Sequence, residues 1–235
     1  MLEENALSLL REGLAAFGLD ETRAALLGDY LSRVLEKNKV MNLTAITDPA
    51  DAVRLHLLDC ATLCAQYTFA GKSVIDVGCG AGLPGLPIRI LEPTVHLTLL
   101  DATEKKIEFL RETAAALALA NVRCIAARAE EAVELREVFD VAVSRAVAPL
   151  NILSELCLPF VRVGGLFCAM KAKAADEELR EAARAIQLMG GTVRESRDYT
   201  IPGTYVTHRA IWIEKVSITP AGYPRRYAKI KQRPL

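Results

Sequence analysis

The sequence predicts an α/β fold in which a mostly parallel sheet follows an N-terminal helical cap and ends in an antiparallel hairpin. Apolar residues in the first 70 positions recur at helical spacing and show no strand pattern. From residue 72 onward, short β-branched runs alternate with helical stretches, which is typical of βαβ units. Residues 192–200 and 205–215 indicate two successive strands joined across Pro202-Gly203, so the last strand pair should be antiparallel.

Three helices are expected in the cap. Gly18 separates the first two. The third begins at Thr47 or Asp48 and has Pro49 inside its first turn, where the missing N–H of proline costs no helical hydrogen bond. The expected cap helices cover residues 3–17, 20–38 and about 48–66.

Five strands of the parallel part follow from short apolar runs, each bounded by turn residues or by a helical stretch. These strands are expected at 73–77, 96–101, 122–126, 139–144 and 165–170. Helices are expected over 86–91 and 103–119 between the strands, and over 174–189 after the last of them. The chain thus divides into a cap over 1–70, an α/β domain over 71–216 and a C-terminal tail over 217–235.

The tail contains five basic residues and no acid, although the whole chain has no net charge. The body therefore carries −5 against +5 in the tail, which indicates a polyanionic partner; a merely solvated tail is the alternative. The five basic residues are Arg225, Arg226, Lys229, Lys231 and Arg233.

Composition argues against a membrane or secreted protein. No stretch approaches the roughly 20 apolar residues of a membrane helix, and the acidic N-terminus lacks a secretory signal, so we expect a cytosolic protein. The six cysteines form no CxxC pair and match no zinc spacing, so we expect free thiols and no metal.

The glycine-rich segment at residues 76–85, DVGCGAGLPG, is the strongest functional signal. It follows a predicted strand and opens a predicted helix, where ligands of open α/β sheets bind. A dinucleotide needs G-x-G-x-x-G, but the spacing here is G-x-G-x-G, and Pro84 has no N–H to donate. The pattern, with an acid two positions before the first glycine, resembles the class I methyltransferase fold, whose first loop wraps the methionine portion of S-adenosylmethionine.

Asp101 supports this interpretation, because it ends the second predicted strand and can accept hydrogen bonds from both hydroxyls of a ribose. Nicotinamide-binding folds use an acid in the same way, so a nicotinamide-dependent oxidoreductase stays an alternative. Ala129-Glu130 follows the third predicted strand, where methyltransferases of this fold contact adenine; a solvated helix over 127–136 is the other reading.

The fourth predicted strand limits the methyl acceptor. Its end, Ser144-Arg145-Ala146, lacks the Asn/Asp-Pro-Pro-Tyr motif typical of enzymes that methylate exocyclic amines of bases. No cysteine in a Pro-Cys context follows it, as nucleophilic attack on cytosine C5 would need.

The chain resembles the RsmG (GidB) family, bacterial methyltransferases that act on N7 of a guanine in 16S ribosomal RNA. The resemblance runs nearly end to end, and Cys79 departs from the Thr or Ser that relatives often have. The matching motifs are Asn42-Leu43-Thr44, His56 with Asp59, residues 76–85, Leu100-Asp101-Ala102, Arg128-Ala129-Glu130, Ser144-Arg145-Ala146 and Met170-Lys171.

The resemblance implies S-adenosylmethionine as cofactor and 16S ribosomal RNA or the small ribosomal subunit as partner, with no obligate protein partner evident. Guanine N7 has an available lone pair, so the reaction needs alignment rather than a general base. Accordingly no catalytic residue is expected beyond Arg145, a candidate for acceptor positioning that also borders the cofactor; Arg145 as a surface helix cap is the alternative. The cofactor residues expected are Gly78, Gly80, Leu83, Asp101, Ala102, Ala129, Glu130 and Arg145.

Candidate RNA contacts come from several segments, and each has a structural alternative. His56 and Asp59 share one helix face and could instead anchor the cap to the sheet, while Lys171 could be a solvated lysine. Tyr223 and Tyr227 interleave with the basic tail, which suits stacking and phosphate contact. The candidate RNA contacts are Arg145, Lys171, His56, Asp59, Arg225 and Arg226.

If the tail binds RNA, deleting residues 219–235 should weaken RNA binding and leave cofactor binding unchanged. A methyltransferase of this fold that acts on another RNA or a small molecule is an alternative function, as is a non-catalytic RNA-binding protein.

Overall fold

A single mixed sheet forms the centre of the molecule in the computed structural model, which describes residues 2–172 and 175–235. Within these residues the strand order is β3-β2-β1-β4-β5-β7-β6, with β1 to β5 parallel and the last two strands antiparallel to their neighbours. The strands are β1 (Ser73–Val77), β2 (His96–Asp101), β3 (Val122–Ala126), β4 (Phe139–Arg145), β5 (Val161–Ala172), β6 (Gly191–Thr200) and β7 (Thr207–Lys215). The mostly parallel sheet with an antiparallel end confirms the predicted fold class.

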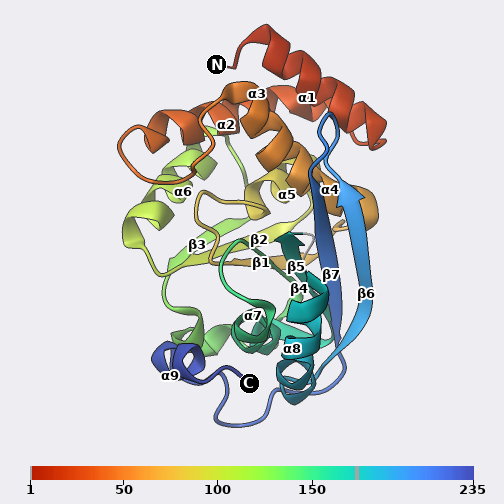
Figure 1. Cartoon of the computed structure of the whole chain (residues 1–235). Coiled ribbons are helices and arrows are strands. Elements are labelled where there is room, and N and C mark those ends of the chain that lie inside the picture. Colours follow the sequence, from red (N-terminus) through yellow and green to blue (C-terminus); the bar gives the residue numbers. More distant parts are fainter. Residues whose placement is uncertain (1, 173–174) are drawn as a thin grey trace.

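The cap lies over one end of the sheet, and α9 lies at the far end of the molecule from it (Figure 1). The cap consists of α1 (Glu4–Ala16), α2 (Ala24–Asn38), α3 (Pro49–Ala52), a π-helical turn (Val53–Leu58) and α4 (Asp59–Gln66). The remaining helices are α5 (Gly85–Leu91), α6 (Glu104–Ala116), α7 (Leu150–Cys157), α8 (Ala175–Leu188) and α9 (Tyr227–Gln232).

Alternating side chains of each strand build two cores, one on each face of the sheet. Along β5, Cys168 and Met170 belong to the core shared with the cap, α5 and α6, whereas Phe167 and Ala169 belong to the core shared with α7 and α8. The cap therefore has no separate core, because its apolar residues form one continuous buried cluster with those of one sheet face.

The order of the strands determines which edge of the sheet carries the candidate site. Because β1 has β2 on one side and β4 on the other, the direction in which successive strands are added to the sheet reverses at β1, and the carboxyl ends of these three parallel strands lie together beside this switch point. The glycine-rich segment follows β1 at this point, Asp101 ends β2 and Arg145 ends β4.

The predicted start of the third cap helix is confirmed, but the helix is not continuous. Asp48 caps it by accepting a hydrogen bond from the Asp51 N–H at 2.9 Å, and Pro49 is the first helical residue. The π-helical turn then widens the helix at residues 53–58, which include His56. Such turns occur often at functional sites.

At two further segments the structure differs from an alternative that the sequence leaves open, a solvated helix over 127–136 and a merely solvated tail. Residues 129–135 form two short 3₁₀ turns, η3 (Ala129–Glu131) and η4 (Val133–Leu135), rather than a helix. The tail is structured: it ends in α9, and Ile230 is fully buried in the core under α7 and α8. The six cysteines are free.

Candidate methyl-transfer site

The glycine-rich segment makes a tight turn that is tied to the neighbouring strand. The N–H groups of Gly78 and Cys79 both donate to the Leu100 carbonyl, at 2.8 and 3.1 Å. Gly78 and Gly80 have φ values of 72° and 55°, in the left-handed region that favours glycine. A Cβ at Gly78 would lie 2.6 Å from Val147 Cγ2, so the loop backbone approaches the opposite wall more closely than a side chain would allow.

The carboxylate of Asp76 binds the end of the glycine-rich segment. It is fully buried, and one carboxylate oxygen accepts from the Gly85 N–H at 2.8 Å, which fixes the start of α5. Its other oxygen, Oδ1, has no partner among the described residues. Burial raises the pKa of Asp76 to about 7, although the Gly85 N–H and the charge of Arg145 act to lower it.

Asp101 connects the loop to the start of α6. Its Oδ2 accepts from the Gly80 N–H at 3.0 Å and its Oδ1 from the Thr103 N–H at 2.9 Å. A carboxylate offers about four lone-pair sites, so two remain for a ligand. The predicted ribose acceptor is therefore already oriented by the backbone.

Two cavities meet at this edge of the sheet and share Gly78, Asp101, Ala102 and Val147. The larger, of about 530 Å³, lies between the glycine loop and the cap; the smaller, of about 220 Å³, lies toward η3 and α9. The larger is also lined by Leu43, Thr44, His56, Cys79, Gly80, Ala81, Leu83, Lys106, Arg145 and Ala146. The smaller is also lined by Val77, Leu100, Ala127, Arg128, Ala129, Glu130, Leu156 and Tyr227.

These residues fit the expected S-adenosylmethionine in shape and chemistry. The apolar walls of the smaller cavity suit a flat ring, and Asp101 at the border suits ribose hydroxyls. In the larger cavity, a Cβ built on Gly80 would meet nothing closer than 4.0 Å, so the loop leaves open space there. All the predicted cofactor residues line one or both cavities.

Arg145 projects from the end of β4 toward the cap. Its guanidinium donates to the Leu55 carbonyl at 3.1 Å, to Asp59 Oδ2 at 2.9 Å and to His56 Nδ1 at 3.2 Å. Arginine has five N–H donors, so two have no partner among the described residues. The next residue, Ala146, has a φ of 57°, a strained conformation of the kind that clusters at functional sites.

Asp59 is the anchor of Arg145. It is fully buried and also accepts from the Tyr199 hydroxyl at 2.8 Å and from His208 Nδ1 at 2.9 Å. Burial acts to raise the pKa of Asp59, but the His208 hydrogen bond and the charge of Arg145 hold it below its ordinary value. Asp59 thus joins the cap, β4 and the β6–β7 hairpin, whose tip reaches the cap in Figure 1.

His56 forms the cap-side wall of the larger cavity. Its Nδ1 lies 3.2 Å from the Arg145 guanidinium and 3.1 Å from the Leu55 carbonyl, and its Nε2 lies 2.7 Å from Thr44 Oγ1. Burial and the charge of Arg145 lower the pKa of His56 to about 4. The imidazole is therefore neutral at pH 7.

Three of the predicted RNA contacts have charges that are paired within the protein. Asp59 is fully buried and cannot reach RNA. The ammonium of Lys171 donates to the Ala148 carbonyl at 2.8 Å and pairs with Glu178 at 2.6 Å, so its side chain is only 11% exposed. Arg225 pairs with the fully buried Glu155 at 2.6 Å. Their charges are used within the protein.

Sequence reasoning missed Lys106, which lines the larger cavity and has no ion-pair partner among the described residues. It also missed Tyr199 and His208. No local signal marks these two, because they reach Asp59 only through the pairing of distant strands.

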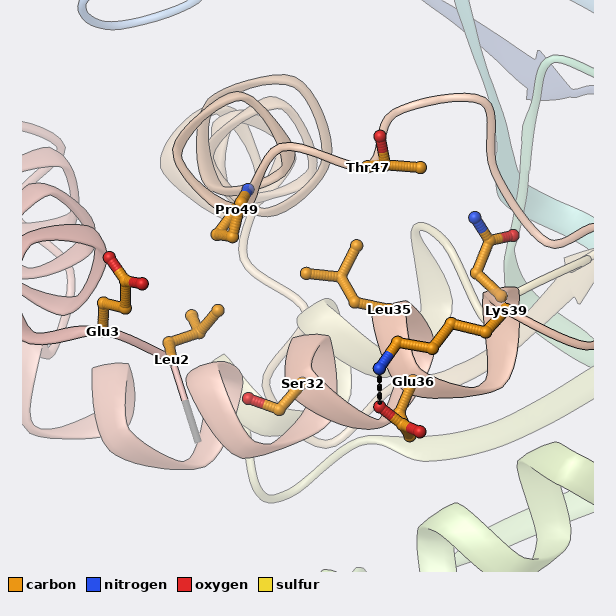
Figure 2. A pocket seen from close by; sticks show the side chains of 9 residues that line it. Leu2, Glu3, Ser32, Leu35, Glu36, Lys39, Thr47 and Pro49 are labelled. Atoms are coloured by element: carbon orange, nitrogen blue, oxygen red, sulfur yellow. Dashed lines mark hydrogen bonds and ion pairs between the residues drawn. The ribbon is translucent and has the colours of Figure 1, made fainter.

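A third hollow, of about 430 Å³, lies within the cap between the start of α1, α2 and the segment before α3 (Figure 2). None of its lining residues borders the two cavities at the sheet edge. Its Lys39 and Glu36 neutralise each other at 2.6 Å, so the hollow presents no unpaired charge from this pair.

Comparisons with known proteins agree with this geometry. A family model described as rRNA small subunit methyltransferase G matches residues 23–200. A protein of Alkaliphilus metalliredigens named ribosomal RNA small subunit methyltransferase G is 40% identical over 233 residues, covering 97% of this chain and 98% of that protein. The protein of the same name from Clostridium tetani is 41% identical over 222 residues, with 93% of each chain covered.

Solved structures share the fold at low identity. A SAM dependent methyltransferase from Aquifex aeolicus aligns with a TM-score of 0.52 and 20% identity, over 69% of this chain and 93% of that chain. A predicted O-methyltransferase from Agrobacterium tumefaciens aligns with a TM-score of 0.53 and 18% identity, over 68% of this chain and 80% of that chain. None of these four proteins is described as an oxidoreductase.

In the residues that the structure describes, no helix has the length and hydropathy to cross a membrane.

Proposed function

The chain belongs to the rRNA small subunit methyltransferase G family, and from this premise we propose that it methylates N7 of a guanine in 16S ribosomal RNA of the small subunit, with S-adenosylmethionine as methyl donor. We place this reaction in the cytosol, where ribosomal RNA is available. The observation that supports the proposal best is the pair of joined cavities across the ends of β1, β2 and β4, with Asp101 at their border.

S-adenosylmethionine supplies an electrophilic methyl group on a sulfonium. The residues of this chain would orient the donor: Asp101 would receive the ribose hydroxyls, and the loop at Gly78 and Gly80 would hold the methionine portion. The N7 lone pair of guanine would attack the methyl carbon and form the new nitrogen–carbon bond, while the pair of the broken carbon–sulfur bond would stay on sulfur. No proton leaves the acceptor, so no general base is needed, and alignment provides the rate gain.

Arg145 is suited to position the acceptor. Two of its five donors are unpaired among the described residues, and its guanidinium lies at the larger cavity. Arginine commonly donates to guanine O6 and N7. Since N7 must stay free to accept the methyl group, we assign the donor contact of Arg145 to O6. The buried Asp59 balances the charge of Arg145, and the neutral His56 adds none.

RNA phosphates would meet basic residues on both sides of the cavities. Lys106 lines the larger one, and Arg128, Arg226 and Lys231 line a hollow of about 740 Å³ that adjoins the smaller one. These four side chains have no ion-pair partner among the described residues. They replace Lys171 and Arg225 as the phosphate contacts we propose.

A methyl-transfer assay with small ribosomal subunits tests the function. Purified protein and S-adenosylmethionine labelled in the methyl group are incubated with subunits from a strain that lacks the gene and, as a matched control, from the parent strain. We expect label in 16S RNA from the deletion strain and little in the parent RNA, which is already methylated. Equal labelling of the two, or label in neither, would contradict the proposal.

A further inference from the structure

The C-terminal tail contributes one side chain to the smaller cavity, where the proposed function places the adenine ring. Tyr227, the first residue of α9, lines that cavity together with residues of β1, β2, η3 and α7. We propose that Tyr227 is a cofactor-binding residue, whose ring packs against the adenine, so that the tail completes the binding site. This inference rests on the proposed function.

The tail is held in place by contacts to the α/β domain on both sides of Tyr227. Before it, Arg225 makes an ion pair with Glu155, which is fully buried in α7, and the Arg225 N–H also donates to Glu155 at 2.8 Å. After it, Ile230 is fully buried in the core. A ring fixed between two such anchors loses little freedom when a ligand binds.

Glu130 gives Tyr227 its position at the cavity. Its carboxylate accepts a hydrogen bond from the Tyr227 N–H at 3.2 Å. The sequence predicts Glu130 at the adenine end, and the structure adds that this residue fixes the first residue of α9 there. The contact brings together residues 97 positions apart, which explains why the sequence could not show it.

The chemistry of the smaller cavity suits an aromatic base. Its walls are mainly apolar, from Leu100, Ala127, Val147 and Leu156 among others, and Asp101 stands at its border with the larger cavity. A ligand that fills both cavities places a ring among these side chains when its ribose reaches Asp101. Aromatic side chains stabilise such rings by stacking, whatever the base.

The assignment reverses one expectation from the sequence. From the sequence, Tyr227 is expected to stack on RNA, and removal of the tail is expected to leave cofactor affinity unchanged. In the structure, Tyr227 lines both the smaller cavity and the neighbouring hollow that contains Arg226 and Lys231. Removal of the tail should therefore weaken cofactor binding as well as RNA binding.

Calorimetric titration with S-adenosylhomocysteine tests the assignment on the full chain without any activity assay. We expect Tyr227→Ala to weaken binding by about 5- to 20-fold, the lower part of the range for base–aromatic stacking. Tyr227→Phe keeps the ring and should bind within about twofold of wild type. Tyr205→Ala, which removes a fully exposed tyrosine that lines neither cavity, is the matched control.

A second measurement separates stacking from a loosened tail. Tyr227→Trp places an indole at the cavity, and its emission should change on titration with S-adenosylhomocysteine, beyond the change of wild type, whose one tryptophan, Trp212, is buried. No added change at saturation would overturn the assignment, as would unchanged affinity of Tyr227→Ala. If wild type itself does not bind S-adenosylhomocysteine, the proposed function fails instead.

Discussion

Replacing His56 by glutamine should change how the stability of the protein depends on pH. His56 is 7% exposed, and burial and the charge of Arg145 lower its pKa from 6.5 to about 4. Between these pH values the unfolded chain binds a proton that the folded protein excludes. The free energy of unfolding therefore falls as the pH falls, by about 1.4 kcal/mol per pH unit and roughly 3 kcal/mol in total.

Asp76 has the opposite effect. Burial raises its pKa from 3.8 to about 7, so in that interval the folded protein keeps a proton that the unfolded chain has lost. Its contribution to the free energy of unfolding therefore falls as the pH rises. Between about pH 4 and 6.5, His56 and Asp76 therefore give the free energy of unfolding opposite slopes against pH in wild type. In His56→Gln only the slope from Asp76 remains.

Urea unfolding of wild type and His56→Gln at several pH values measures this difference. The free-energy difference between the two proteins should shift by roughly 2–3 kcal/mol between about pH 4.5 and 7.5. His96→Gln, which removes an exposed histidine at the start of β2, is the matched control. A His56→Gln curve parallel to wild type would show that His56 titrates in the same way in both states, contrary to its environment in the structure.

Three further predictions concern the binding surfaces. Gly78→Val should abolish S-adenosylhomocysteine binding measured by calorimetry, because its Cβ would lie 2.6 Å from the opposite wall of the cavity; Gly71→Val, at a similar φ of 67° but with nothing within 4 Å, controls for backbone strain alone. Asp101→Asn should lower that affinity by about tenfold or more, because charge-assisted hydrogen bonds to the ribose are lost; a change below about twofold would make the acid purely structural. The double substitution of Arg226 and Lys231 by alanine should reduce the slope of log RNA affinity against log salt by about 1.4 in filter binding, since each phosphate contact with a single strand contributes about 0.7, and an unchanged slope would remove both residues from the RNA contact.

The sheet was predictable from local sequence where turn chemistry and side-chain pattern agree. The first two strands match their predicted ranges at both ends, 73–77 and 96–101. Each is a short apolar run, the first followed by glycines and the second ended by an acid. The glycine spacing likewise indicated the binding edge, because left-handed backbone at Gly78 and Gly80 is needed for the turn.

The contacts around Asp59 could not be predicted in this way. Tyr199 and His208 lie 140 and 149 residues further along the chain, and they reach Asp59 only because β7 pairs with β5 and carries β6 with it. From the sequence, His56 and Asp59 are equally suited to contact RNA and to anchor the cap to the sheet. The structure gives anchoring for Asp59, whereas His56 forms part of the cavity wall.

The tail shows a different limit. Five basic residues without an acid indicate a polyanionic partner or a merely solvated tail, because the pattern contains no information about partners elsewhere in the chain. In the structure one of the five, Arg225, is neutralised by Glu155 of α7, and Ile230 is buried. For the other basic residues of the tail, the contact with a polyanion that the charge asymmetry indicates stays a proposal.

The position of the transferred methyl group tests the proposed function most directly. After reaction with the purified protein, 16S RNA from the deletion strain is digested to nucleosides and analysed by mass spectrometry, and the intact RNA is cleaved with borohydride and aniline, which cut at N7-methylguanosine. We predict N7-methylguanosine as the new nucleoside and cleavage at a single position that unreacted RNA does not show. A methyl group on another atom or base would contradict the account of an acceptor that is aligned without a general base.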